Sequence, residues 1–275
     1  MKPPRRLLDS TLRDGEQSPG VSFTAQQKLE IAALLDGAGV YQIEAGTPAS
    51  SKREKEIIAK IVGNRKNSLV SAWARLVLSD IEHAIDVAPD FVHVSVPVSY
   101  VHIYAKLRKN KNWVIGQLYA CLGLAEKRGA RLSVGFEDAF RSEPSFLITV
   151  SRILLDFGVT RIRLSDTVGT ATPTLCRTAV RDLNDAFGGK AELGFHGHND
   201  LGMATANTLE AMKSGCMYAD VTLRGIGERA GNCDLSELVR AASPSFDLGI
   251  KPEAARELTR RFDEILGKAG EPNDE

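Results

Sequence analysis

Two histidines, His196 and His198, lie one residue apart in the segment GFHGHNDLG, and Asn and Asp follow them at once. In an extended strand, residues i and i+2 project to the same side, so both imidazoles would face one point. Two imidazoles aimed at one point supply half of a divalent-metal site. The alternative is that the histidines are polar residues satisfied near a strand end, and the positions of the other polar residues bear on that choice.

The elements that must hold these histidines follow a regular alternation. Short runs rich in apolar and β-branched residues begin near residues 5, 40, 68, 90, 131, 160, 191 and 219, and stretches with helical spacing separate them. In the clearest helix, over 23–39, Thr24 and Gln27 resemble a capping box. Eight such units predict a (β/α)8 TIM barrel of class α/β. The alternative is an open doubly wound sheet, but the first turn, RDGEQSPG, lacks the expected glycine-rich phosphate pattern.

Composition sets the domain organisation and excludes several classes of partner. We expect residues 1–250 to form the catalytic barrel and residues 251–275 to form a C-terminal helix and an acidic tail. Lys+Arg and Asp+Glu are balanced at 35 each, which favours neither nucleic acid nor anionic lipid as a partner. The four cysteines form no C-x-x-C pair, and neither a signal peptide nor a membrane-spanning apolar run is found. These features predict a cytoplasmic protein with reduced thiols.

Polar residues cluster where each strand of the predicted barrel ends, which is where barrels of this kind carry their chemistry. They are Arg13, Asp14, Glu16 and Gln17; Glu44; Arg75; Glu137 and Asp138; Asp166 and Thr167; His196, His198, Asn199 and Asp200; and Glu228, Arg229 and Asn232. Barrel closure makes the seventh, eighth and first strands neighbours, so Asp14 and Asn232 can reach the two histidines. Imidazole nitrogens with carboxylate and amide oxygens predict a catalytic metal site.

Four further residues have both a chemical and a structural interpretation. Arg13 could polarise a carbonyl beside the metal, or could be an ordinary surface charge next to Asp14. Glu137 or Asp138 could handle a proton, or could form a charge pair at a helix start. Thr167 could donate to a substrate carboxylate or end a turn.

The remaining histidines carry less information. His83 and His93 are interpreted as scaffold residues. The role of His102 stays open, because its loop contains three lysines and one arginine that could cover an anionic ligand.

Three segments resemble the signatures of the 2-isopropylmalate synthase and homocitrate synthase family, which belongs to a superfamily of metal-dependent acyltransferases and lyases. They are DSTLRDGEQSPG, FHGHNDLGMATANTLEAMKSG and GIGERAGN, and the resemblance spans roughly Leu8 to Ala242. It implies a Claisen condensation of acetyl-CoA with a 2-oxo acid, followed by thioester hydrolysis. It also implies a divalent cation, Mg²⁺, Mn²⁺ or Zn²⁺, and a homodimer.

The resemblance assigns roles to individual residues. Asp14, His196 and His198 correspond to the metal ligands, with Asn232 nearby, and Arg13 corresponds to the residue that activates the substrate carbonyl. The residues that match the oxo-acid pocket are Gln17, Glu44, Glu137 and Thr167. We expect Glu137 to act with Arg13 in catalysis.

The subgroup that the chain resembles most is the nitrogenase-associated homocitrate synthases, which use 2-oxoglutarate. Lysine-pathway homocitrate synthases commonly carry Arg-x-Ser-x-Glu on the fifth strand, whereas the positions here are Ser133, Gly135 and Glu137. Arg224 stands where a small or amide residue is usual. It could pair with a dicarboxylate or with a surface neighbour.

The family's helical lid motif, whose histidine assists proton transfer from acetyl-CoA, has no counterpart after the barrel. Two alternatives therefore accompany the synthase hypothesis. One is a barrel-only hydroxyacyl-CoA lyase, a class in which a reactive cysteine follows the eighth strand, near the position of Cys233. The other is the barrel of a split synthase that receives its lid from a separate subunit.

Overall fold

Eight parallel strands close into a barrel in the order β1 to β8 in the computed structural model, which describes residues 1–267. The strands are β1 (Arg6–Asp9), β2 (Gln42–Glu44), β3 (Leu69–Arg75), β4 (Phe91–Pro97), β5 (Leu132–Glu137), β6 (Arg161–Asp166), β7 (Glu192–Gly197) and β8 (Tyr218–Val221). Since β1 pairs with both β2 and β8, the sheet has no free edge. The predicted (β/α)8 barrel is confirmed.

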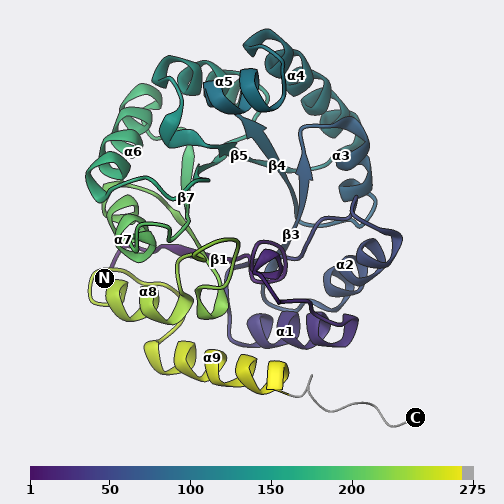
Figure 1. The fold of residues 1–275 in the computed structure, drawn as a ribbon, viewed down its shortest axis with the longest axis vertical. Coiled ribbons are helices and arrows are strands. Elements are labelled where there is room, and N and C mark those ends of the chain that lie inside the picture. The colour runs from purple at the N-terminus through teal and green to yellow at the C-terminus, as the bar shows by residue number, and fades with distance from the viewer. Residues whose placement is uncertain (268–275) are drawn as a thin grey trace.

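Helices form a ring outside the barrel (Figure 1). They are α1 (Ala25–Gly37), α2 (Lys52–Asn64), α3 (Leu78–Ile85), α4 (Lys111–Arg128), α5 (Pro144–Asp156), α6 (Pro173–Phe187), α7 (Ala204–Ser214) and α8 (Leu235–Ala242). The capping box predicted at the start of α1 is present, because Thr24 and Gln27 bond each other's backbone N–H groups. A ninth helix, α9 (Pro252–Gly267), packs against α1 and α8, and the predicted acidic tail lies outside the described residues.

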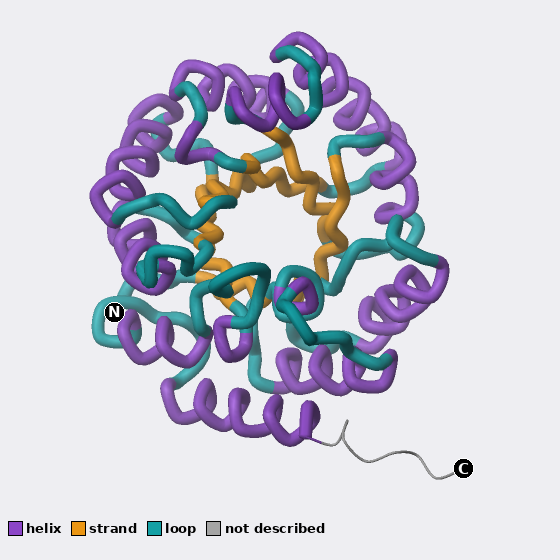
Figure 2. The backbone as a smooth tube through the Cα atoms, viewed as in Figure 1, coloured by secondary structure: helices purple, strands orange, loops and turns teal. Residues whose placement is uncertain are grey.

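The chain crosses the face at the carboxyl ends of the strands through short helical turns (Figure 2). These turns are η1 (Gly15–Gln17) after β1, η2 (Val101–Lys106, a π-helical turn) after β4, η3 (Ala139–Arg141) after β5 and η4 (Leu223–Gly225) after β8. The predicted strand-end residues after β1 and β5 lie on or beside η1 and η3, whereas those of β2, β3, β6 and β7 lie at the strand ends or in the loops that follow. Within residues 1–267, no helix is long and apolar enough to cross a membrane.

The two faces of each strand differ sharply in polarity. On β5, Leu132, Val134 and Phe136 pack into the hydrophobic layer under the helices. The residues between them face the barrel axis. One of these, Ser133, shares a 2.9 Å hydrogen bond with Nδ1 of His93 of β4. Interiors of such barrels are usually filled by branched apolar side chains. Here the interior also holds polar and charged residues, among them His93, Arg163 and Asp220.

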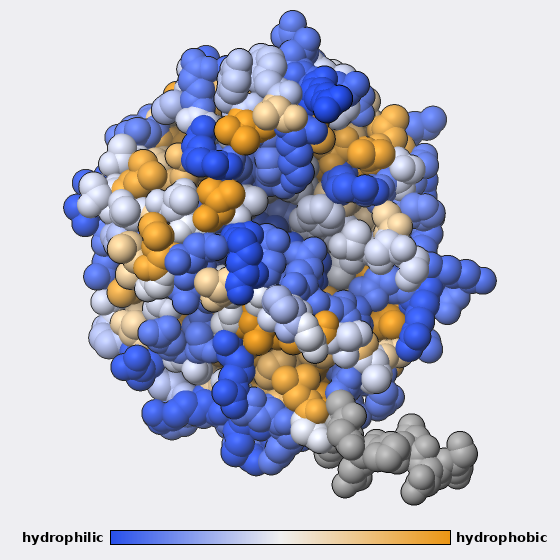
Figure 3. All heavy atoms as spheres, viewed as in Figure 1, coloured by the Kyte–Doolittle hydropathy of each residue, from blue (hydrophilic) through white to orange (hydrophobic). Residues whose placement is uncertain are grey.

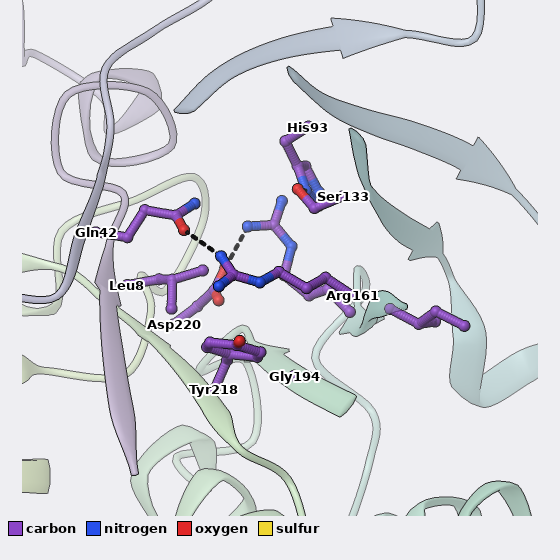
Figure 4. Close-up of a pocket in the computed structure, with 10 residues that line it drawn as sticks. Leu8, Gln42, His93, Ser133, Arg161, Gly194, Tyr218 and Asp220 are labelled. Carbon is purple, nitrogen blue, oxygen red and sulfur yellow. Dashed lines mark hydrogen bonds and ion pairs between the residues drawn. The ribbon is translucent and has the colours of Figure 1, made fainter. Parts of the chain in front are cut away.

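Arg161 closes the lower end of this interior. Its guanidinium donates to the Tyr41 hydroxyl at 2.8 Å and lies 4.1 Å from the ring centre of Phe91 and 4.8 Å from that of Tyr218. Figure 4 shows Arg161 reaching across toward Gln42. The rings and the cation line the floor of the interior, next to a pocket of about 20 Å³, enough for one water molecule.

Substitution of Phe262 in α9 tests whether this last helix is part of the folded barrel. Its ring is fully buried and meets Phe23 edge to face at a centroid distance of 6.1 Å. We expect Phe262→Ala to lower the free energy of unfolding by about 3–5 kcal/mol, measured by urea denaturation. Arg260→Ala on the exposed side of α9 should leave stability near the wild-type value. Equal effects of the two substitutions would contradict integral packing of α9.

Candidate metal and oxo-acid site

His196 and His198 meet at the carboxyl end of β7, as their spacing predicted. Their Nε2 atoms lie 3.3 Å apart, and Oδ2 of Asp14, from the turn after β1, lies 3.8 Å from Nε2 of His196. All three side chains are buried, and their ligand atoms lie within 4.8 Å of one another. This convergence of two nitrogens and a carboxylate fits a divalent metal ion.

Asn232 reaches the same point from the loop after β8. Its Nδ2 donates to Oδ2 of Asp14 and to the carbonyl of Ile226, whereas its Oδ1 is buried without a hydrogen-bond partner in residues 1–267. Gly227 makes this approach possible, because a Cβ there would lie 2.1 Å from Nδ2 of Asn232. The unpaired amide oxygen is a further observation that fits a bound cation.

The protonation of this group also suits a metal. Burial alone would raise the pKa of Asp14, but the charges of Arg13, His196 and His198 and the bond from Asn232 hold that pKa at about 2. Burial and the neighbouring His196 lower the pKa of His198 to about 3. At neutral pH, Asp14 is therefore an anion and His198 a neutral imidazole, the forms that bind metals.

Asp220 of β8 orients the first histidine and is a site residue that the sequence analysis missed. Its Oδ2 lies 3.1 Å from Nδ1 of His196. A carboxylate that accepts the Nδ1–H leaves the Nε2 lone pair free for a metal. The available signal was an acidic residue in the apolar run ADVTL, two positions from Tyr218 on the same strand face.

Arg13 lies beside the metal-binding group with two of its nitrogens held by carboxylates. Its Nη1 donates to Oδ1 of Asp14 at 2.9 Å, and its Nε donates to Oε1 of Glu44 at 2.6 Å. The side chain also lies over Trp73, with 5.6 Å between the guanidinium carbon and the ring centre. Nη2 makes no hydrogen bond within residues 1–267, so it is available to a ligand.

The structure separates the two acidic candidates after β5. Asp138 is engaged by Arg141 through bonds of 2.7 and 2.8 Å, which is a structural role. The Glu137 side chain is 31% exposed and its Oε1 lies 3.6 Å from Nδ1 of the buried His102. Thr167 accepts the backbone N–H of Asp138 at 2.8 Å, which leaves its own hydroxyl proton for another acceptor.

Other strand-end candidates serve neighbouring structure. Three of them form ion pairs: Glu16 with Lys28, Arg75 with Asp80, and Arg224 with Asp263 of α9. Asn199 accepts the backbone N–H of Ala204 at the start of α7, and Asp166 accepts two backbone N–H groups. Gln17 is exposed and lines a cleft with Arg13. Arg224 thus has the surface neighbour that the sequence left as one alternative. In Figure 3 the middle of this face is hollowed and surrounded mostly by hydrophilic residues.

Arg229 joins the loops after β6, β7 and β8. It donates to Asp200 at 2.8 and 3.0 Å and to the carbonyl of Thr167 at 2.8 Å. Its own backbone is left-handed, with φ 54°, three residues before Asn232. The Arg229 side chain therefore restrains the loop that carries the amide of Asn232.

Removal of this restraint should weaken metal binding. We expect Arg229→Met to lower the affinity for Mn²⁺ by about tenfold, in the range found for residues that support metal ligands, as measured by titration calorimetry. Arg224→Met is the matched control, since Arg224 lies in the same loop but pairs with Asp263 at the surface. Its Mn²⁺ affinity should match the wild type, and equal losses in both variants would refute a specific role for Arg229.

Several relatives of this chain are synthases. The chain is 39% identical over 258 residues to 2-isopropylmalate synthase 2 of Caldanaerobacter subterraneus, covering 93% of this chain and 67% of that relative. It is 40% identical over 236 residues to a homocitrate synthase of Frankia alni, covering 86% and 67%. It is also 39% identical over 234 residues to homocitrate synthase subunit alpha of Clostridium pasteurianum, covering 85% and 86%.

Solved structures support the fold. The HMG-CoA lyase of Bacillus subtilis superposes with a TM-score of 0.84 at 20% identity, covering 97% of this chain and 96% of the lyase. The sequence profile of the HMGL-like family matches residues 5–255, which is nearly the whole described chain. On this match and on the synthase relatives, the protein belongs to the HMGL-like family.

Proposed function

We propose that this chain condenses acetyl-CoA with 2-oxoglutarate and hydrolyses the resulting thioester to give homocitrate and CoA. Its relatives are synthases of the acyltransferase type, and the chain is an enzyme of that kind. The observation that carries the proposal is that Arg13 donates to Asp14 at 2.9 Å, while Asp14 forms a buried group with His196 and His198 whose ligand atoms lie within 4.8 Å of one another. A cation next to a metal suits the activation of a ketone beside a carboxylate.

Each polar group at the mouth then has a task. Asp14, His196, His198 and Asn232 would hold the divalent ion, Mg²⁺, Mn²⁺ or Zn²⁺, which supplies Lewis-acid polarisation of the ketone when bound. Arg13 donates to the oxygen on which negative charge develops, and Glu44 keeps that guanidinium in place. Thr167 donates its hydroxyl proton to the substrate carboxylate. Gln17 lines a cleft with Arg13, and we assign it to the entrance of the site.

Carbon–carbon bond formation also needs a base that removes a methyl proton of acetyl-CoA. Glu137 is partly exposed at the mouth and adjoins His102, so we assign it this role. The resulting enolate carbon attacks C2 of the oxo acid, whose ketone oxygen becomes an alkoxide and takes up a proton. Water then cleaves the thioester, which releases CoA and the new carboxylate.

Polar lining below the mouth supports 2-oxoglutarate over a branched apolar oxo acid. Ser95 and Ser165 alternate with core residues on β4 and β6, on either side of Gly135 of β5. His93 of β4 lies beneath them, and its buried Nε2 has no hydrogen-bond partner within residues 1–267. An isopropyl group would lack apolar contacts in this region, whereas a second carboxylate could accept hydrogen bonds there.

A second form of the proposal has its own support. The relative from Clostridium pasteurianum is named a subunit, and this chain covers 86% of it. Turnover could therefore require a separate chain that carries a lid. A homodimer and a cytoplasmic location stay predictions from the sequence.

A CoA-release assay tests the proposal. With acetyl-CoA and Mn²⁺, we expect turnover with 2-oxoglutarate at least tenfold above that with 2-oxoisovalerate or pyruvate, and none in His196→Ala. Higher turnover with 2-oxoisovalerate would refute the substrate assignment. If no oxo acid releases CoA but 2-oxoglutarate binds in a metal-dependent manner, the assay is repeated with a co-expressed lid-bearing subunit, and continued absence of turnover would refute the condensation.

Cys233 distinguishes condensation from a cysteine-assisted lyase reaction. Its side chain is fully buried, and burial raises the pKa of the thiol to about 12, so it is not a reactive thiolate. We expect Cys233→Ala to keep CoA release within about threefold of the wild type. Loss of activity with intact folding and metal affinity, together with cleavage of a hydroxyacyl-CoA by the wild type, would favour the lyase instead.

A further inference from the structure

Arg163 lies at the centre of the barrel and has no role in the proposed reaction. It faces the axis from β6, in register with Gly135 of β5, and its side chain is only 8% exposed. One nitrogen, Nη1, donates to two acceptors: Oε2 of Glu44 at 3.0 Å and Oδ2 of Asp220 at 2.5 Å. A single guanidinium therefore joins carboxylates from β2 and β8.

Each of these carboxylates makes a second contact at the active site. The other oxygen of Glu44 accepts Nε of Arg13 at 2.6 Å. The same Oδ2 of Asp220 lies 3.1 Å from Nδ1 of His196. The result is an unbroken line of alternating groups, Arg13, Glu44, Arg163, Asp220 and His196, which runs through the barrel from the ketone-activating cation to a metal ligand.

Because the line is buried, each of its charged groups depends on its neighbours in the line. Glu44 and Asp220 are each 2% exposed, and a buried charge without a partner is strongly destabilised. With both carboxylates fixed by one guanidinium, their remaining lone pairs point at Arg13 and His196. Without Arg163, Arg13 would be the one remaining partner of Glu44 within residues 1–267 and His196 that of Asp220, so both carboxylates would be free to turn.

We propose that Arg163 is a positioning residue that aligns Arg13 and His196 together, through Glu44 and Asp220, without touching metal or substrate. The Arg13 half of this inference rests on the proposed function. The His196 half concerns metal binding alone, and can be tested whether or not the chain condenses acetyl-CoA.

Arg161 provides a matched control. It lies two residues earlier on the same strand and also faces the axis, but it is held by Tyr41, Gln42 and aromatic rings at the floor of the barrel. Arg161→Met and Arg163→Met thus remove the same group from adjacent layers. Only the second breaks the line to the active site.

The experiment measures Mn²⁺ affinity by calorimetry and the absorption spectrum of bound Co²⁺ in the wild type, Arg161→Met, Arg163→Met and Asp220→Asn. We expect Arg163→Met to weaken Mn²⁺ binding by tenfold or more and to shift the Co²⁺ spectrum, as supporting residues of metal ligands do. Arg161→Met should lower the melting temperature yet leave both metal readouts unchanged. Arg163→Lys replaces Arg163→Met if the latter fails to fold. It should give an intermediate loss, because the ammonium keeps the charge but ends one bond short of the position that Nη1 occupies between the two carboxylates.

A double variant tests the route. If Arg163 acts on His196 through Asp220, then Arg163→Met combined with Asp220→Asn should bind Mn²⁺ no more weakly than the weaker single variant. In active enzyme, Arg163→Met should also lower kcat at saturating metal and oxo acid. Unchanged metal affinity in folded Arg163→Met, additive losses in the double variant, or equal losses in Arg161→Met would each overturn the inference.

Discussion

Charged side chains taken out of water must stay paired, and this requirement organises the molecule from the floor of the barrel to its mouth. Arg161 is enclosed by rings and amide groups at the bottom, Arg163 joins two carboxylates in the middle, and Arg13 bridges Glu44 and Asp14 at the top. A barrel of branched apolar residues would be easier to fill. The ionic interior instead fixes side-chain directions, which a site built for charge development requires.

The outer layers make this interior possible. Because side chains alternate along each strand, the valines and leucines that face the helices supply the hydrophobic driving force, while the residues between them are free to carry charge. Closure of β1 onto β8 then brings Asp14, His196 and Asn232 together, although the first and last are more than two hundred residues apart. Hydrogen bonds between loops, such as those from Arg229 to Asp200 and Thr167, then hold the loops at the carboxyl ends of the strands together.

The sequence predicted the barrel and the metal-binding group for topological reasons. Strand ends share one face, β7 and β8 neighbour β1, and i, i+2 histidines point together, so no atomic detail is needed to gather Asp14, His196, His198 and Asn232. Arg163 and Asp220 could not be found this way. Their meeting depends on strand tilt and on side-chain reach across the interior. A single sequence cannot distinguish an arginine that bonds carboxylates across the axis, such as Arg163, from one that bonds Tyr41 and Gln42 at the lower end of the barrel, such as Arg161.

The departure on β5 from the Arg-x-Ser-x-Glu pattern has a local physical reason. His93 of β4 bonds Ser133 through Nδ1 and lays the other edge of its ring against Gly135. A Cβ at position 135 would lie 2.6 Å from Nε2 of His93, so even an alanine would force the ring to move. The ring of His93 in its present position therefore requires glycine at position 135. In the layer of the barrel interior next to the guanidinium of Arg163, the polar side chain therefore comes from His93 of β4 and not from position 135 of β5. The proposed oxo-acid pocket therefore involves a pair of strands, β4 and β5, that the β5 pattern alone does not reveal.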